Sequence, residues 1–182
     1  VKAGKTRIID VTPLDHVLAF RIVLGRFMAY FHNNYGFNLG SAVGCDPDVA
    51  WANFGFALSS KKYQYDFDYS NFDASHSESI FELLKQFVFT KDNGFDHRCS
   101  LMIDSLVTST HCYEEQRMTI RGGLPSGTSG TSVINTIINN IIFKAALYHT
   151  YSNFEWDDVK MLAYGDDIVA ASDCLLDLDK VK

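Results

Sequence analysis

Two adjacent aspartates stand between two apolar segments near the end of the sequence. The motif Tyr164-Gly165-Asp166-Asp167 separates the apolar residues 159–163 from 168–171. Gly165 suits a tight turn, so this stretch predicts two antiparallel strands joined as a hairpin. Adjacent carboxylates in a tight turn repel one another unless a cation neutralises them. Because side chains alternate along a strand, we expect one aspartate to bind a metal ion directly and the other to assist.

A second acidic motif follows an earlier predicted strand. Residues 63–69 are aromatic and alternate with polar residues, which is typical of a strand, and Asp66 and Asp68 fall on one face of it. The motif DYSNFD, residues 68–73, comes at its end, where a carboxylate can hold a hard divalent cation. For this motif alone, an aspartate that caps the following turn is the more common explanation.

A loop of small residues forms the third motif, GGLPSGTSGT at residues 122–131. Such a loop lets the backbone approach a phosphate or a sugar, with hydroxyls and a helix start offering hydrogen bonds. Gly122 and Gly127 have the spacing of a Walker A loop, but Thr128 stands where its lysine belongs, which argues against an ATPase. Ser126 lacks the frame of a hydrolase nucleophile. A flexible helix start remains the alternative for the loop alone.

Apolar residues at helical spacing predict the first two helices. Pro13 opens a predicted helix that runs to Asn33. A capping box of Ser75 with Glu78 predicts the start of another helix, which ends before Gly94. Its predicted buried stripe consists of Ile80, Leu83, Leu84, Phe87 and Val88.

The pattern further along the chain predicts a short helix, a hairpin and a long helix. The short helix covers residues 100–108, and a polar hairpin covers residues 112–120. The long helix begins at Thr131. One face of it carries Ile134, Ile137, Ile138, Ile141 and Ala145, and the other carries Asn135, Asn139 and Asn140.

Composition limits the class of protein. The 182 residues are 47% apolar, which suits one globular unit of moderate size. No apolar stretch is long enough to span a membrane. The four cysteines and six histidines show no zinc-ligand spacing, and the cysteines suggest no disulfide framework.

Charge raises an objection to a nucleic-acid partner. The net charge is −6, and phosphate binding is normally supplied by Lys and Arg. The objection weakens if the acidic residues gather at a metal site and the basic surfaces lie on parts of the protein outside this sequence. Lys5 and Arg7 form a small basic cluster near the start, for which a solvated pair is the ordinary explanation.

Together and in this order, DYSNFD, GGLPSGTSGTSVINTIINN and YGDD resemble palm motifs A, B and C of RNA-dependent RNA polymerases, specifically those of picornaviruses. GKTRIID at residues 4–10 is similar to the basic fingertip motif of that family, and GSAVGCDPD at residues 40–48 adds context. The resemblance covers nearly the whole chain. It implies an α/β (α+β) fold, a polymerase palm with an antiparallel sheet backed by helices, plus partial fingers segments.

The resemblance also implies a subdomain for each part of the chain. Residues 1–62 correspond to partial fingers and the start of the palm, and residues 63–97 to the palm with motif A. Residues 98–125 correspond to a fingers insertion, and residues 126–182 to the palm with motifs B and C.

The function implied by the resemblance is template-directed RNA synthesis, in which two metal ions assist nucleotidyl transfer from ribonucleoside triphosphates to an RNA 3′-hydroxyl. Asp68 and Asp166 match the aspartates that bridge two Mg²⁺ ions, for which Mn²⁺ can substitute, and Asp167 lies beside them. Lys5 and Arg7 match residues that hold the triphosphate. The residues that match the group recognising ribose are Asp73, Ser126, Thr131 and Asn135. Gly127 matches a glycine that lets the loop move as the template advances.

Partners and location follow from the same resemblance. The expected partners are an RNA template and primer, ribonucleoside triphosphates, a protein primer and other viral replication proteins, with no direct membrane span. The expected location is the host cell cytoplasm, at membrane-associated replication complexes.

The absence of an initiating Met predicts either excision from a polyprotein or a partial clone. A lysine that the family places beyond Lys182, and the thumb, are missing. We therefore expect residues 1–182 alone to be inactive, and template-dependent incorporation by them would contradict this.

Two other functions are possible from the sequence. A reverse transcriptase or DNA polymerase shares a carboxylate palm, but Asp73 with Asn135 favours ribonucleotides. A non-catalytic RNA-binding or scaffold module descended from such an enzyme is the alternative from another class. The retained aspartates Asp68 and Asp166 and the acidic balance argue against it.

Overall fold

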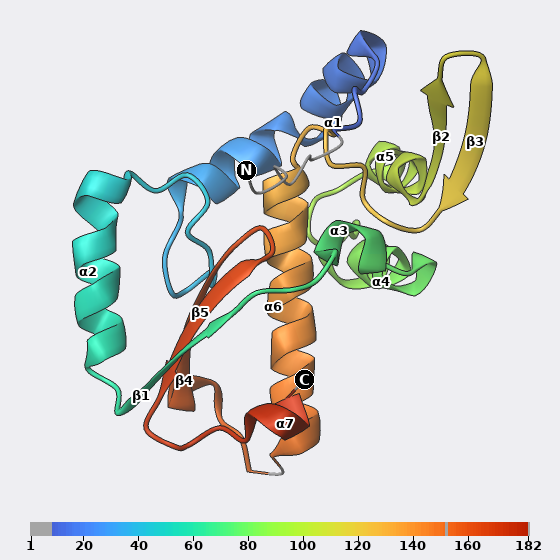
Figure 1. Ribbon diagram of the computed structural model, residues 1–182. Helices are drawn as coiled ribbons and strands as arrows, with labels where there is room; N and C mark the ends of the chain where they lie inside the picture. The colour runs from blue at the N-terminus through green and yellow to red at the C-terminus, as the bar shows by residue number, and fades with distance from the viewer. Residues whose placement is uncertain (1–8, 152, 182) are drawn as a thin grey trace, which may run out of the picture. The chain divides into compact units, whose positions relative to one another are not determined.

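The computed structural model describes residues 9–151 and 153–181, and its contacts divide the chain into two compact units (Figure 1). Unit 1 comprises residues 1–26 and 71–131, and unit 2 comprises residues 27–70 and 132–182. Helices α1 (Leu14–Asn33) and α6 (Thr131–Thr150) each contribute residues to both units. None of the helices in the described ranges has the length and apolar character needed to cross a membrane.

An antiparallel sheet of three strands lies at the centre of unit 2. Its strands are β1 (Tyr63–Phe67), β4 (Val159–Tyr164) and β5 (Asp167–Ser172), in the order β1-β5-β4. The predicted hairpin is confirmed as β4 and β5, whose closing pair is Tyr164 with Asp167. The predicted strand at 63–69 is confirmed as β1, which ends at Phe67.

Helix α6 supplies much of the core beneath the sheet. Phe143 and Leu147 pack with residues of β4 and β5, and the Phe67 and Phe143 rings lie 5.4 Å apart between centroids. Burying such side chains contributes roughly 25 cal/mol per Å² of apolar surface. The predicted long helix is confirmed, but its asparagine face is also buried, at Asn135, Asn139 and Asn140.

The first part of unit 2 closes one edge of this sheet. The segment 40–42 runs beside β4, where the Ala42 N–H donates to the Ala163 carbonyl and the Ala163 N–H donates to the Gly40 carbonyl, both at 2.9 Å. Helix α2 (Pro47–Ser59) follows, and the Asp46 side chain caps it by accepting from the backbone N–H of Asp48. Phe31, Val43 and Val133 form a second apolar cluster.

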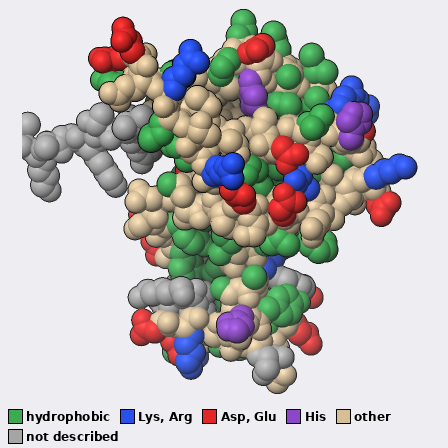
Figure 2. Space-filling model, turned by 90° about the vertical axis from the view of Figure 1, so that its right-hand side faces the viewer, with side chains coloured by type: hydrophobic (Ala, Val, Ile, Leu, Met, Phe, Trp, Pro, Cys, Tyr) green, Lys and Arg blue, Asp and Glu red, His purple; other side chains and the backbone are tan. Residues whose placement is uncertain are grey.

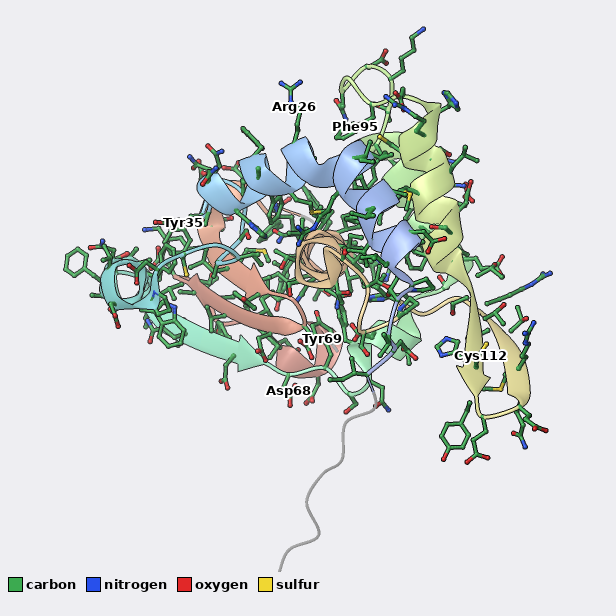
Figure 3. All side chains as sticks on the ribbon, turned by 90° about the horizontal axis from the view of Figure 1, so that it is seen from above. Arg26, Tyr35, Asp68, Tyr69, Phe95 and Cys112 are labelled. Atoms are coloured by element: carbon green, nitrogen blue, oxygen red, sulfur yellow. The ribbon has the colours of Figure 1, made fainter. Side chains whose placement is uncertain are left out.

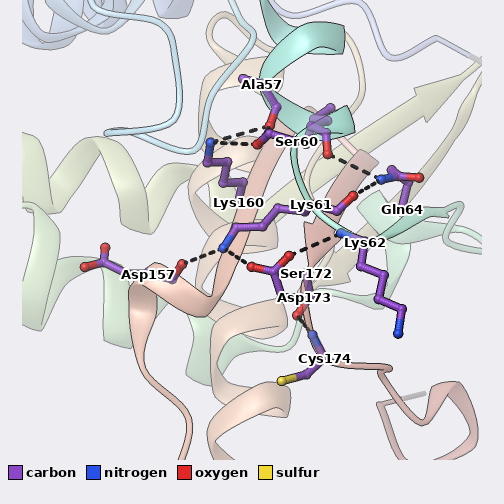
Figure 4. A network of polar contacts seen from close by, with 11 residues as sticks. Ala57, Ser60, Lys61, Lys62, Gln64, Asp157, Lys160, Ser172, Asp173 and Cys174 are labelled. Atoms are coloured by element: carbon purple, nitrogen blue, oxygen red, sulfur yellow. Dashed lines mark hydrogen bonds and ion pairs between the residues drawn. The ribbon is translucent and has the colours of Figure 1, made fainter.

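An ion pair ties the start of β1 to the end of β5 (Figure 4). Lys61 Nζ lies 2.8 Å from Asp173 Oδ2, and the Lys62 backbone N–H donates to Asp173 Oδ1 at 3.2 Å. Lys61 also donates to the carbonyl of Asp157, which lies within the short 3₁₀ helix η2 (Trp156–Asp158). The last helix is α7 (Leu178–Val181).

Unit 1 contains short helices and a two-stranded ribbon. The helices are α3 (Phe72–Ser75), α4 (Glu78–Leu83), the π-helix η1 (Leu84–Val88) and α5 (His97–Val107). The ribbon consists of β2 (Thr108–Tyr113) and β3 (Gln116–Arg121). The predicted first helix, short helix and polar hairpin are thus confirmed as α1, α5 and β2–β3. Every β3 residue is exposed. Figure 2 shows the molecule from the side on which the ribbon lies in Figure 1. On this face, acidic and basic side chains are interspersed among apolar ones.

The predicted capping box is wrong. Ser75 ends α3, where its hydroxyl donates to the Phe72 carbonyl at 2.7 Å, and the residue at the N-cap of α4 is Ser77. The predicted buried stripe is also partly wrong, because Leu83 is 39% exposed and Phe87 70% exposed. Leu84 is buried as predicted, and Phe81, which the prediction left out, is buried as well. The π-helix η1 takes more residues per turn than an α-helix, so a stripe drawn at α-helical spacing loses its phase there.

Candidate active site

The two-aspartate turn, Tyr164–Asp167, joins β4 to β5 with Gly165 and Asp166 as its central residues. Gly165 has φ +66°, a left-handed conformation that glycine adopts at little cost. A glycine at the first central position is typical of the type II′ turns that fit the twist of a hairpin. Gly165 is buried, whereas Asp166 and Asp167 are exposed. The turn therefore presents both carboxylates outward from a buried backbone.

The backbone of this turn is hydrogen-bonded to α6. The Gly165 N–H donates to Thr136 Oγ1 at 2.8 Å. Asn139 Nδ2 donates to the carbonyls of Gly165 and Asp166, both at 3.1 Å. Thr136 and Asn139 lie three residues apart, on one face of the helix, and both are 0% exposed.

Asp68 lies at the same end of the sheet as the turn. Strand β1 runs antiparallel to β5 with Phe67 opposite Ile168, so the end of β1 meets the start of β5, where Asp167 stands. Figure 3 shows Asp68 at the strand end and Tyr69 directed toward α6. The Tyr69 hydroxyl donates to Asn139 Oδ1 at 3.2 Å. Burial raises the pKa of Tyr69 above its ordinary value, so the hydroxyl keeps its proton at neutral pH.

The donor set of Asp68, Asp166 and Asp167 suits a hard divalent cation. All three side chains are exposed, and within the described ranges none has a Lys, Arg or His partner in an ion pair. No three or more His, Cys, Asp or Glu side chains of residues 9–151 and 153–181 form a ready metal-binding group. Magnesium commonly binds through one or two carboxylates, with water and substrate phosphates completing its shell. The residues therefore fit an open site better than a closed protein cage.

The glycine-rich loop lies in unit 1, beside the segment that follows motif A. The Leu124 N–H donates to the Asp73 carbonyl at 2.8 Å, and the Gly123 N–H donates to the His76 carbonyl at 2.7 Å. Thr131 Oγ1 donates to the Thr128 carbonyl at 2.6 Å, within the loop itself. The backbone thus brings Asp73 close to the loop that carries Ser126.

Gly127 packs against the start of the described chain. A Cβ added at Gly127 would collide with the Asp10 carbonyl, and Thr12 Oγ1 donates to the Gly127 carbonyl at 3.2 Å. The position therefore requires glycine for space.

The remaining predicted nucleotide-binding residues are divided between unit 2 and the undescribed start. Asn135 lies in unit 2, buried in α6. Lys5 and Arg7 lie outside the described residues.

Sequence reasoning missed the residues that hold the turn, namely Tyr69, Thr136 and Asn139. The available signal was the presence of polar residues in an otherwise apolar helix, among them Asn139, whose role the sequence alone does not indicate. A buried amide needs hydrogen-bond partners, so such a residue in a packed helix indicates a specific contact.

The family model described as viral RNA-dependent RNA polymerase matches residues 1–182. This chain belongs to the viral RNA-dependent RNA polymerase family. The family uses divalent metal ions, in keeping with the exposed carboxylates of the two-aspartate turn.

Relatives of this polymerase chain include two genome polyproteins. The chain is 70% identical to a segment of the Cosavirus A genome polyprotein and 53% identical to a segment of the encephalomyocarditis virus genome polyprotein. Both alignments cover 100% of the chain, which spans only 9% and 8% of these relatives.

A solved structure, the Sicinivirus 3Dpol RNA-dependent RNA polymerase, matches 97% of the chain with a TM-score of 0.83 and 30% identity. The chain covers 38% of that protein. The predicted fold class and the resemblance to picornavirus polymerases are confirmed.

Proposed function

We propose that the full-length protein containing this chain synthesises RNA on an RNA template, transferring nucleotides from ribonucleoside triphosphates to an RNA 3′-hydroxyl. The observation that carries the proposal is the position of Asp68, Asp166 and Asp167 at one end of the β1-β5-β4 sheet in a viral RNA-dependent RNA polymerase chain. These carboxylates are exposed, as residues that meet a substrate must be.

The proposed metal ions are two Mg²⁺, with Mn²⁺ able to replace them. Asp68 and Asp166 would hold both ions, and Asp167 would assist from the adjoining position. When bound, such ions polarise the attacking hydroxyl and offset the charge on the leaving pyrophosphate. The chain itself holds the backbone of this turn, since Asn139 donates to the Asp166 carbonyl.

The proposed nucleotide site draws on several segments. Lys5 and Arg7 would hold the triphosphate, because Lys and Arg are the usual phosphate ligands. Gly127 would let the loop shift as the template advances. Hydrogen bonds to the ribose 2′-hydroxyl, which distinguish RNA precursors from DNA precursors, would come from Asp73, Ser126, Thr131 and Asn135.

The proposal extends to subdomains, partners and location. Residues 1–62 and 98–125 would belong to the fingers, with the palm beginning within 1–62, and residues 63–97 and 126–182 would form the palm. The partners would be an RNA template and primer, a protein primer and other viral replication proteins. The matched relatives are genome polyproteins, which supports co-production with other viral proteins. RNA synthesis would take place in the host cytoplasm, at membrane-associated replication complexes.

The test is incorporation of labelled ribonucleotides on a primed RNA template by the full-length parent, with magnesium supplied. Asp166→Asn keeps the size of the side chain and removes its charge. We expect incorporation to fall on the order of a thousandfold, because a bound metal ion contributes several kcal/mol to transition-state stabilisation. The thermal unfolding midpoint should stay near that of the parent, since Asp166 is exposed. Equal incorporation by both proteins, or none by the parent, would contradict the proposal.

A further inference from the structure

One buried side chain touches both segments that carry the proposed metal ligands. Asn139 accepts from the hydroxyl of Tyr69, one residue after Asp68, and donates to the carbonyls of Gly165 and Asp166. Thr136, one turn earlier on α6, accepts from the Gly165 N–H. The three side chains Tyr69, Thr136 and Asn139 are named here the turn anchor.

We propose that the turn anchor consists of positioning residues, which set where the Asp166 and Asp68 carboxylates stand relative to each other. The inference rests on the proposed function, because it concerns the same site. None of the three residues needs to touch a substrate or a metal ion in order to act.

The hydrogen bonds of the turn anchor reach backbone atoms that the hydrogen bonds between β4 and β5 do not pair. The Gly165 and Asp166 peptides are the centre of a two-residue turn, beyond the last pair of β4 and β5. Three of their polar atoms, the Gly165 N–H and both carbonyl oxygens, are bonded to side chains of α6. Fixing these atoms limits rotation of the peptide units next to the Asp166 Cα. The direction of its carboxylate is limited accordingly.

The placement of polar residues along α6 supports a role beyond packing. Where the helix lies under the middle of the sheet, its contacts are apolar, through Phe143 and Leu147. Where it meets the turn, the buried residues are Thr136 and Asn139. An amide costs free energy to bury unless its polar atoms are paired, so a buried amide indicates specific partners. Both polar atoms of the Asn139 amide are paired, one toward each carboxylate-bearing segment.

A fixed direction matters because phosphoryl transfer depends on alignment. A shift of about 1 Å in a reacting group can cost about a hundredfold in rate. Loosening the anchor should therefore reduce the rate of the chemical step more than the binding of the nucleotide.

The experiment uses the full-length polymerase and two matched pairs of variants. Tyr69→Phe removes the hydroxyl that bonds Asn139, and Tyr65→Phe is its control. Tyr65 lies on β1, the strand that precedes Tyr69, and its hydroxyl accepts from the Leu176 N–H at 2.8 Å. Thr136→Val removes the acceptor for the Gly165 N–H at nearly constant volume, and Thr136→Ser retains it.

Two properties of each protein are measured besides its thermal unfolding midpoint. The first is the split between kcat and KM for the incoming nucleotide. The second is the affinity of the RNA-free protein for Mn²⁺, measured from the electron paramagnetic resonance signal of the unbound ion. Mn²⁺ binding needs no catalytic turnover, so it reports on the carboxylates alone.

We expect Thr136→Val to lower kcat about tenfold and Tyr69→Phe to lower it about threefold, with KM little changed. Thr136→Ser should restore most of the rate. Both loss variants should weaken Mn²⁺ binding about threefold, whereas Tyr65→Phe should lower only the unfolding midpoint. Asn139→Leu, which removes the whole amide, should lower kcat about a hundredfold if the protein folds.

The outcomes separate this inference from the proposed function. If Tyr69→Phe and Thr136→Val match the Tyr65→Phe control in kcat and Mn²⁺ binding, the anchor has only a structural role and the inference is wrong. If the parent shows no polymerisation, the proposed function fails, and the Mn²⁺ data still decide whether the anchor positions the carboxylates. Failure of Asn139→Leu to fold leaves both matched pairs to decide.

Discussion

The two hairpins of this chain have the same size and similar turns, yet they differ in how they are held. Strands β2, β3, β4 and β5 each have six residues, and both turns have two central residues preceded by tyrosine. Both turn regions carry two adjacent acids, Glu114-Glu115 in one and Asp166-Asp167 in the other. The β3 strand is exposed throughout, whereas most of β4 is buried.

The two turns therefore share an acidic pair but differ in the support that their backbones receive. The β4–β5 turn has short acidic side chains on a backbone that Thr136 and Asn139 hold from below. The β2–β3 turn has longer, exposed side chains, and its first central residue, Glu114, adopts φ +53° without being glycine. Local sequence sets the turn in both hairpins, and the buried helix face gives only one of them a fixed direction.

The largest expected contrast compares the second acid of each turn in the full-length polymerase. Asp167→Asn should reduce RNA synthesis about tenfold to a hundredfold, since it removes a negative charge beside the proposed metal ions. Glu115→Gln should leave it unchanged, because Glu115 is exposed on the ribbon. Incorporation of labelled ribonucleotides measures both. A comparable loss in Glu115→Gln would show that the ribbon takes part in catalysis and would break the comparison.

A smaller contrast concerns the backbone of the two turns. Gly165→Ala should lower the free energy of unfolding by about 1 kcal/mol, because residues other than glycine disfavour positive φ. Apart from the two chain neighbours of Gly165, no described residue has an atom within 4 Å of the added Cβ, so the cost is confined to the backbone. Glu114→Gly should act in the opposite direction, raising it by up to about 1 kcal/mol through relief of the same strain. Urea unfolding of the full-length protein measures both, and a loss of stability in Glu114→Gly would contradict the explanation.

The smallest expected effect lies at the far end of the β4–β5 hairpin. The Lys61 ammonium holds the pKa of Asp173 below its usual value. The stability from this pair is therefore present above the ordinary carboxyl pKa and is lost as the pH falls through the lowered value. Asp173→Asn should lower the thermal unfolding midpoint slightly at pH 7, and the difference from the parent should vanish in acid. A difference that persists below the lowered pKa would mean that charge is not its cause.

Much of the fold could be predicted because the apolar pattern of its main elements continues over many residues. The long helices α1 and α6 and the β4–β5 hairpin have clear periods, and each was placed correctly. The error at Ser75 arose because Ser75 and Ser77 both suit a helix start, and short helices give too few turns to choose between them. The π-helix η1 could not be foreseen, since its phase shift depends on hydrogen bonds rather than on composition.

The candidate site likewise has a part that could be predicted from the sequence and a part that could not. The aspartates could be proposed from the sequence because adjacent charges in an apolar hairpin are costly without a partner. The turn anchor could not, because its bonds join Asn139 to the backbone of residues 26 and 27 positions away. Every residue has a backbone carbonyl, so the sequence does not indicate which carbonyls accept from Asn139. The roles of Lys5, Arg7 and the ribose group stay predictions.

Substitutions of Gly40 should be poorly tolerated for a reason that is unrelated to catalysis. Gly40 adopts φ +61°, and a Cβ added there would collide with the Asn140 side chain, whose amide donates to the Gly40 carbonyl at 2.9 Å. Asn140 in turn donates to the Thr136 carbonyl, at the base of the turn anchor. Intolerance at position 40 would thus look like that of Asp166 while having a purely spatial origin. Separating the two requires comparing protein abundance with specific activity, because only a spatial defect removes the folded molecule itself.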